Sequence, residues 1–148
     1  MANFNVIDDV IVIPEEITKL EDGAFEECTP FKTITIPNNI NEIEQGALSF
    51  CSSLESITLP ESVTEMGDNI FFECTSLKSI NIPERVTEIG EYLFEACPAL
   101  KTIYVTKGRG KEVKTMLPEK LREFVGEVSG LKNNGTKFKG IFSKLFGS

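Results

Sequence analysis

Four cysteines recur at intervals of 23 residues, and thiols at a fixed spacing suggest zinc binding or disulfide formation. Equal spacing over this distance predicts a stack of layers in which the thiols form a straight row, about 4.8 Å apart. A straight row cannot surround a tetrahedral zinc ion. We therefore expect small, buried thiols and no metal, with a disulfide between neighbouring layers as the alternative. The cysteines are Cys28, Cys51, Cys74 and Cys97.

Carboxylates accompany the cysteines, and a pair of them could do general acid–base chemistry. Such a pair needs one member buried enough to shift its pKa, and no feature of the sequence isolates one. The sequence also has no histidine, no G-x-S-x-G, no phosphate-binding glycine loop and no H-E-x-x-H. We expect a solvated acidic face, no cofactor and no enzymatic activity. The carboxylates are Glu26, Glu27, Glu42, Glu65, Glu73, Glu88 and Glu95.

The cysteines belong to a repeated unit, because three other columns of residues also advance by 23 positions. A fixed period between about 20 and 50 residues indicates a stack of like units, each of which buries its apolar face against its neighbours. The columns are Pro14, Pro37, Pro60 and Pro83; Ile17, Ile40, Val63 and Val86; and Phe25, Leu48, Phe71 and Phe94.

Each unit begins with a predicted strand. In Ile80-Asn81-Ile82-Pro83 apolar and polar residues alternate, which is typical of a strand with one buried and one outward face. Proline lacks the N–H that a strand ladder needs, so the strand should end there. The second half of the unit spaces its apolar residues three and four apart. It is too short for a long helix and fits a turn or a short helical segment, with a second short strand.

The unit from Cys74 to Cys97 follows the pattern Cys-x-x-Leu-x-x-Ile-x-Ile-Pro-x-x-Val-x-x-Ile-Gly-x-x-Ala-Phe-x-x-Cys. This pattern resembles the BspA-like leucine-rich repeat, and the resemblance covers about residues 10–105. It implies a short curved solenoid with a sheet on one face, and recognition of proteins or surfaces without catalysis. Ala24 and Ala47 fill the alanine position in other copies. The departures are Leu48 for phenylalanine, Met66 for isoleucine, and Ile70 and Leu93 for alanine.

These features predict a short right-handed, β-rich solenoid of the leucine-rich-repeat type, with a parallel sheet on one face. We expect an N-terminal cap strand over 1–14, about four repeats over 15–105 and a helical C-terminal cap over 106–128. Residues 129–136 are the predicted linker to a basic amphipathic tail over 137–148. The cap carries apolar residues at helical spacing, and the last coil of a solenoid needs such a cover.

Charge divides the chain into two parts. Residues 1–105 carry five basic and nineteen acidic side chains, whereas residues 106–148 carry ten basic and four acidic ones. An acidic body repels phosphates, so we do not expect it to bind nucleic acid. The N-terminus lacks the basic and apolar regions of a signal peptide, and no stretch approaches the ~20 apolar residues of a spanning helix. We expect a cytoplasmic protein that can associate with a membrane through its tail.

The outward strand positions form the predicted protein-binding face, because the sheet of a solenoid is the usual recognition surface. Strand propensity alone also explains much of the threonine in this column. The predicted contact residues are Thr33, Thr35, Ser56, Thr58, Ser79, Asn81, Thr102 and Tyr104, with Lys78 and Lys101 beside them.

The tail has apolar residues at helical spacing between lysines, and residues 139–147 resemble the membrane-targeting tip of MinD-type ATPases. Its apolar side could enter a lipid headgroup region while the lysines meet anionic lipid. Docking on the acidic solenoid, docking on a partner, and disorder are the alternatives. The residues are Phe138, Ile141, Phe142, Leu145 and Phe146, with Lys137, Lys139 and Lys144.

The sequence thus predicts a non-enzymatic, cytoplasmic adaptor that binds a protein partner, whose identity the residues do not specify, through its sheet. Its C-terminal segment would attach it to a membrane or a partner. The alternative is a structural subunit of a larger homo- or hetero-assembly.

Overall fold

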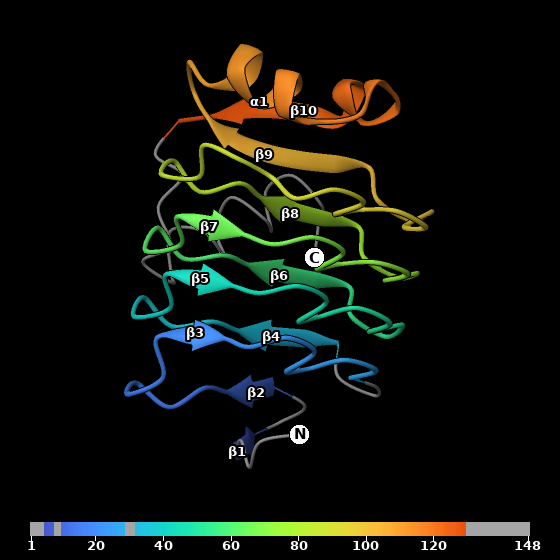
Figure 1. Ribbon diagram of the computed structural model, residues 1–148. Coiled ribbons are helices and arrows are strands. Elements are labelled where there is room, and N and C mark those ends of the chain that lie inside the picture. Colours follow the sequence, from blue (N-terminus) through green and yellow to red (C-terminus); the bar gives the residue numbers. More distant parts are fainter. Residues whose placement is uncertain (1–4, 8–9, 29–31, 130–148) are drawn as a thin grey trace.

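The computed structural model describes residues 5–7, 10–28 and 32–129, and it shows successive coils of chain stacked on one another (Figure 1). The predicted tail over 137–148, and the linker beyond Ser129, lie outside the described residues. Two sheets run along the stack, one of seven strands and one of three. The predicted leucine-rich-repeat fold with a parallel sheet is therefore confirmed.

The seven-stranded sheet has the order β1-β2-β4-β6-β8-β9-β10. Its first two strands form an antiparallel pair, and the others are parallel. Strands from successive repeats pair in a register of 23 residues, as the columns predict: Ser56 lies opposite Ser79, and Ser79 opposite Thr102. The strands are β1 (Asn5–Ile7), β2 (Val10–Val12), β4 (Thr33–Thr35), β6 (Ser56–Thr58), β8 (Ser79–Asn81), β9 (Thr102–Thr106) and β10 (Val125–Val128).

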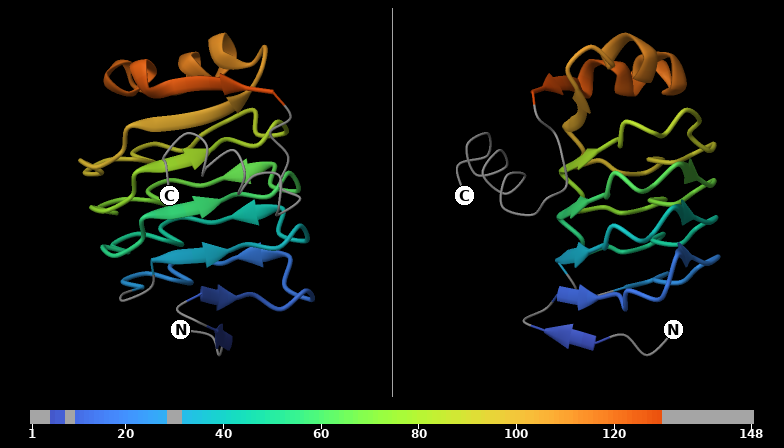
Figure 2. Two further views of the ribbon diagram at one scale, coloured as in Figure 1. Left: turned by 180° about the vertical axis from the view of Figure 1, so that it is seen from behind. Right: turned by 90° about the vertical axis from the view of Figure 1, so that its left-hand side faces the viewer.

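A smaller parallel sheet is made by the second half of each unit, as Figure 2 shows on the far side of the coils from the larger sheet. Its strands are β3 (Lys19–Leu20), β5 (Glu42–Ile43) and β7 (Glu65–Met66), and a single bridge from Met66 to Ile89 extends it into the fourth repeat. The spacing of three and four between apolar residues thus becomes short strands joined by turns.

The core lies between the two sheets and consists of the repeated apolar columns. Phe25, Leu48 and Phe71 are fully buried, and the rings of Phe71 and Phe94 stack at 5.7 Å between centroids. Because equivalent side chains contact one another along the stack, each coil buries its apolar surface against the next, at a gain of about 25 cal/mol per Å².

Two further columns lie at the turns and have positive φ angles. One contains Gly23, Gly46, Asn69 and Tyr92, and the other immediately precedes the cysteines. Left-handed backbone lets the chain reverse direction within a few residues, and glycine adopts it without cost. The second column consists of Glu27, Phe50, Glu73 and Ala96.

The last coil is covered by α1 (Gly110–Met116) and the 3-10 helix η1 (Glu119–Phe124). Val113, Leu117 and Leu121 join the apolar core from these helices, which confirms the predicted helical cap. The apolar residues after Phe124 do not continue the helix. They form β10, which pairs with β9 and adds one more strand to the larger sheet.

Candidate protein-binding face

The outward positions of the seven-stranded sheet form two rows, which we call the outer face. In one row, Thr33, Ser56, Ser79 and Thr102 are register neighbours. In the other, Thr35 pairs with Thr58, and Asn81 pairs with Tyr104, which is followed by Gly126. The parallel register therefore brings the predicted contact residues together on one surface, in repeat order.

Part of the outer face is open. Thr33, Lys78 and Lys101 are exposed, and Ser56, Thr58 and Thr102 are half-buried. The Lys78 ammonium lies 3.1 Å from the Glu55 carboxylate of the preceding coil. Exposed pairs of this kind contribute at most about 1 kcal/mol to stability, so both groups remain available to a partner.

Three of the predicted contact residues are not open to solvent. Ser79, Asn81 and Tyr104 are only 2%, 4% and 3% exposed. They cluster at the C-terminal end of the outer face, on β8 and β9. Strand alternation says on which side of the sheet a residue lies, but it does not say what covers that side.

Asn81 is buried because its side chain is part of the sheet. Its amide donates to the carbonyl oxygen of Leu59 at 2.8 Å, and its Oδ1 accepts from the Leu59 N–H at the same distance. Both polar ends of the amide are thus satisfied by the backbone N–H and carbonyl oxygen of one residue, as burial of an amide requires. Asn81 is a structural residue and is not available to a partner through these atoms.

Tyr104 is buried in a different manner. Its neighbours along β9, Ile103 and Val105, belong to the apolar core, whereas Tyr104 does not. Its side chain therefore lies on the opposite side of the sheet. Burial raises the pKa of the Tyr104 phenol, because the ionised form loses contact with water.

The cysteines form the predicted row, and their thiols are free. Cys28, Cys51 and Cys74 are buried, and Cys97 is half-buried. The thiols donate to backbone carbonyl oxygens 26 residues earlier: Cys51 Sγ to Phe25 at 3.1 Å and Cys74 Sγ to Leu48 at 3.1 Å. Cys97 Sγ makes the equivalent bond to Phe71 at 3.0 Å.

This position makes the thiols poor nucleophiles. Burial raises the pKa of the Cys97 thiol to about 11. The interaction with Cys51, together with burial, raises the pKa of Cys28 as well. A thiol that stays protonated near pH 7 neither attacks nor ligates readily. Among the described residues, no group of three or more acidic, histidine or cysteine side chains is placed to hold a metal ion.

The predicted acidic face follows the smaller sheet and the adjoining turns. Glu65 and Glu88 are exposed, Glu42 is half-buried, and Glu42 and Glu65 are register neighbours. The Lys19 ammonium lies 2.9 Å from Glu44 and lowers the pKa of that carboxyl. A general acid needs a raised pKa, so this displacement is in the wrong direction for one.

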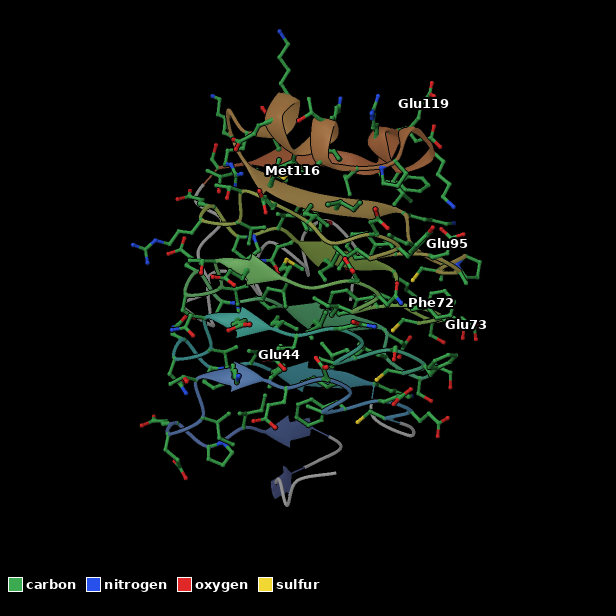
Figure 3. All side chains as sticks on the ribbon, viewed as in Figure 1. Glu44, Phe72, Glu73, Glu95, Met116 and Glu119 are labelled. Carbon is green, nitrogen blue, oxygen red and sulfur yellow. The ribbon has the colours of Figure 1, made fainter. Side chains whose placement is uncertain are left out.

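Sequence reasoning missed an aromatic pair at the turns beside the cysteines. Phe50 and Phe72 come from neighbouring coils and meet edge to face, with ring centroids 5.6 Å apart. Phe50 is 36% exposed. Figure 3 shows Phe72, Glu73 and Glu95 along this edge of the stack. The two residues occupy different positions of the repeat, so no column of the repeat indicated the pair.

A cavity of about 530 Å³ separates the last coil from the C-terminal cap. A salt bridge of 3.1 Å between Lys120 and Glu95 crosses from one to the other. Figure 3 labels Met116, the last residue of α1, and Glu119, the first residue of η1, in the cap above the last coil. The lining residues are Ile89, Gly90, Glu91, Tyr92, Leu93, Phe94, Glu95, Met116, Leu117, Pro118, Lys120 and Leu121.

Comparison with solved structures shows the same kind of fold. A leucine-rich repeat protein from Bacteroides capillosus is 31% identical, with a TM-score of 0.55 over 60% of this chain and 63% of that protein. The T. pallidum leucine rich repeat protein TpLRR is 18% identical, with a TM-score of 0.51 over 97% of this chain and 92% of that one. The pneumococcal vaccine antigen PcpA is 23% identical, with a TM-score of 0.63 over 66% of this chain. The chain spans only 24% of that antigen.

Among curated proteins, none matches this chain. In the part of the chain that the structure describes, no helix has the length and apolar character to cross a bilayer. Repeat proteins of the leucine-rich type serve as protein-interaction or structural modules. The sequence model of the family 'BspA type leucine rich repeat region (6 copies)' matches residues 6–115, and the chain therefore belongs to this family.

Proposed function

We propose that this protein is a non-enzymatic adaptor that binds a protein partner through the open part of its outer face. The observation that carries the proposal is the row of in-register, small polar side chains at the N-terminal end of that face, where Thr33 is exposed and Ser56 and Thr58 are half-buried. Small hydroxyl side chains leave the sheet shallow, so a partner's loop or extended segment can approach the backbone closely. Lys78 and Lys101 add positive charge at its border.

A matched pair of substitutions tests this face. Thr58→Arg places a long charged side chain in the middle of the open part. Thr87→Arg adds the same side chain to an exposed position in the turn region of the fourth repeat, away from the outer face. A partner captured by the unmodified protein should be retained by Thr87→Arg and lost by Thr58→Arg. Equal retention by both variants contradicts the proposed face.

We further propose that the basic tail over 137–148 attaches the adaptor to a membrane in the cytoplasm. Its chemistry supports this role, because five apolar residues at helical spacing are accompanied by three lysines. Each lysine near an anionic surface contributes about 1 kcal/mol, so binding should be reversible and dependent on salt.

Vesicle flotation with the full chain tests the tail. Phe142→Asp/Phe146→Asp adds two charges to the apolar side, and Ser143→Asp/Gly147→Asp adds the same two charges at neighbouring positions. The parent and the second variant should float with vesicles that contain phosphatidylserine, and the first variant should not. Failure of all three proteins to float contradicts membrane attachment.

A structural subunit is the second candidate, and open strand edges favour it. Among the described strands, β1 ends the larger sheet and β3 ends the smaller one, at the same end of the stack. Unpaired strand edges are templates for pairing with another chain. This function predicts self-association at micromolar concentration, which sedimentation measures. A monomer at that concentration excludes self-assembly through these edges.

A further inference from the structure

We propose that the chain's own C-terminal segment, residues 137–148, docks on the outer face over Ser79 and Tyr104. The starting point is the burial of these two side chains, which are 2% and 3% exposed although both lie on the outward side of the sheet. Ser79 is a register neighbour of Ser56 and Thr102, which are half-buried in the same row. Something must cover the C-terminal end of this face and leave its N-terminal end open.

None of the described elements provides that cover. In the edge-on view of Figure 2 (right), the coloured coils and helices all lie on one side of the seven-stranded sheet. The cap residues Val113, Leu117 and Leu121 belong to the apolar core, which is the side that Tyr104 does not face. Over residues 5–7, 10–28 and 32–129, the outer face therefore has no layer packed on it.

The C-terminal segment starts in the right place. β10 is the last strand of the larger sheet, and its Gly126 is the register neighbour of Tyr104. Residues 130–136 can extend about 23 to 25 Å at roughly 3.3 to 3.6 Å per residue. The seven strands together span only about 29 Å at roughly 4.8 Å each. A short connection therefore brings residues 137–148 over β9 and β8 without strain.

The chemistry of the two surfaces also fits. The segment has five apolar side chains at helical spacing, and an amphipathic helix of this kind is stable only when its apolar side is covered. On the sheet, the ring of Tyr104 offers an apolar contact. Ser79 and Gly126 carry small side chains or none, which leaves a shallow seat beside it.

This arrangement goes beyond the proposed adaptor function and does not depend on it. The apolar side of the segment can cover Tyr104 or enter a membrane, but it cannot do both. A docked segment also occupies one end of the outer face. Release of the segment therefore exposes an extended outer face and a membrane-binding helix at the same time.

Acrylamide quenching of tyrosine fluorescence tests the proposal on the full chain. The protein has no tryptophan, so Tyr92→Phe leaves Tyr104 as the only tyrosine and gives it a clean signal. Tyr92 is 61% exposed and phenylalanine keeps its ring, so this background should fold as the parent does. In it, Tyr104 should be shielded. Phe142→Asp/Phe146→Asp should lose this shielding and approach the quenching of the urea-unfolded chain, whereas Ser143→Asp/Gly147→Asp should retain it.

Each other outcome overturns the proposal. Shielding that persists in both variants means that another layer covers Tyr104, and quenching that is high in all three proteins means that Tyr104 is open. Equal loss of shielding in both variants assigns the effect to charge alone. Shielding that disappears on dilution assigns the cover to a second copy of the chain. Circular dichroism of each variant verifies that the solenoid remains folded.

Discussion

Asn81 and Leu59 are joined by two hydrogen bonds of 2.8 Å: the side-chain amide of Asn81 accepts from the backbone N–H of Leu59 and donates to the backbone carbonyl oxygen of Leu59. The β6–β8 ladder pairs Ser56 with Ser79, and the amide continues the connection two residues further along. Leu59 is fully buried, so water cannot replace the bonds. The side-chain amide of Asn81 therefore links β8 of the fourth repeat to the end of β6 of the third.

Asn81→Ala should lower the free energy of unfolding by about 2 to 4 kcal/mol, because it leaves a buried N–H and a buried carbonyl oxygen unpaired. Thr58→Ala, one coil earlier in the same row, is the control and should cost less than about 1 kcal/mol. Urea denaturation of the full chain measures both values. Similar losses for the two variants would show that the amide contributes nothing beyond packing.

Arg109, in the C-terminal cap, hydrogen-bonds to the backbone of the fourth repeat in the way that the first two repeats are each bonded by a side chain of the next one. In the second and third coils, Asn39 and Ser62 donate to the carbonyl oxygens of Ile17 and Ile40, one coil back. The guanidinium of Arg109 donates to the equivalent carbonyl of Val86 and to that of Pro83, both at 2.9 Å.

Replacing Arg109 with alanine should cost about 2 to 4 kcal/mol, since two charge-assisted bonds are lost from a side chain that is only 14% exposed. Arg109→Lys should recover only part of this loss, because an ammonium lacks the planar fork. Glu112→Ala breaks only an exposed salt bridge to the same arginine and should cost less than about 1 kcal/mol. Denaturant midpoints compare the three variants, and full recovery by lysine would contradict the forked geometry.

The periodic columns were sufficient to predict the stack, the strands and the buried cysteines. Side chains that recur every 23 residues, such as Phe71 and Phe94, must lie over one another once the units stack. The columns in the sequence therefore predict directly which side chains contact each other. The helical cap followed from spacing in the same way, because Val113 and Leu117 lie four residues apart.

What the columns could not predict depends on single residues that interrupt them. β10 was missed because Val125 and Val128 also fit the apolar side of a helix. They form a strand because β9 otherwise has an unpaired edge, and this edge cannot be seen in the sequence. Asn81 replaces the threonine of its column and is held in the sheet by hydrogen bonds to the backbone N–H and carbonyl oxygen of Leu59. The burial of Tyr104 depends on what lies on the outer face, which strand alternation does not specify.

Gly90 lies where two coils approach most closely. A Cβ at this position would be 2.3 Å from the carbonyl oxygen of Gly67 and 2.6 Å from the backbone nitrogen of Asp68. Backbone atoms of a stacked coil cannot move aside, so Gly90→Ala should cost about 3 kcal/mol or more. Gly126→Ala, which meets nothing within 4 Å, should change stability by less than about 0.5 kcal/mol. Thermal unfolding of both proteins tests this difference, and equal melting temperatures would contradict the close approach.

Tyr92 should be a site where glycine stabilises the protein. It has a φ of 56° at a position that glycine occupies in the first two repeats, and its side chain is 61% exposed. A left-handed backbone costs a residue with a Cβ about 1 to 2 kcal/mol. Glycine avoids this cost, but it also increases the conformational entropy of the unfolded chain, which offsets part of the gain. Tyr92→Gly should therefore gain up to about 1 kcal/mol. Tyr92→Ala keeps the left-handed cost and should gain nothing, so equal gains would assign the effect to loss of the aromatic ring.

The thiol row should make stability depend on pH in the alkaline range. A hydrogen bond with Cys28 lowers the pKa of Cys51, but Cys74 and burial raise it more, to about 12. Burial raises the pKa of Cys97 to about 11, whereas thiols in the unfolded chain ionise near about 8.5. The folded protein thus holds protons that the unfolded chain releases. The contribution of the thiols to the free energy of unfolding should therefore be constant below about pH 8 and fall as the pH rises toward 11.

Urea denaturation between pH 7 and pH 10 measures this fall, and Cys97→Ser should show a shallower one, because serine has no proton to lose in this range. A thiol reagent at pH 8 gives an independent measurement, since thiolate is the reactive form. Native protein should react slowly at all four cysteines, and protein in urea should react at once. Rapid reaction of the folded chain, or a pH profile that Cys97→Ser leaves unchanged, would contradict the protonated thiol row.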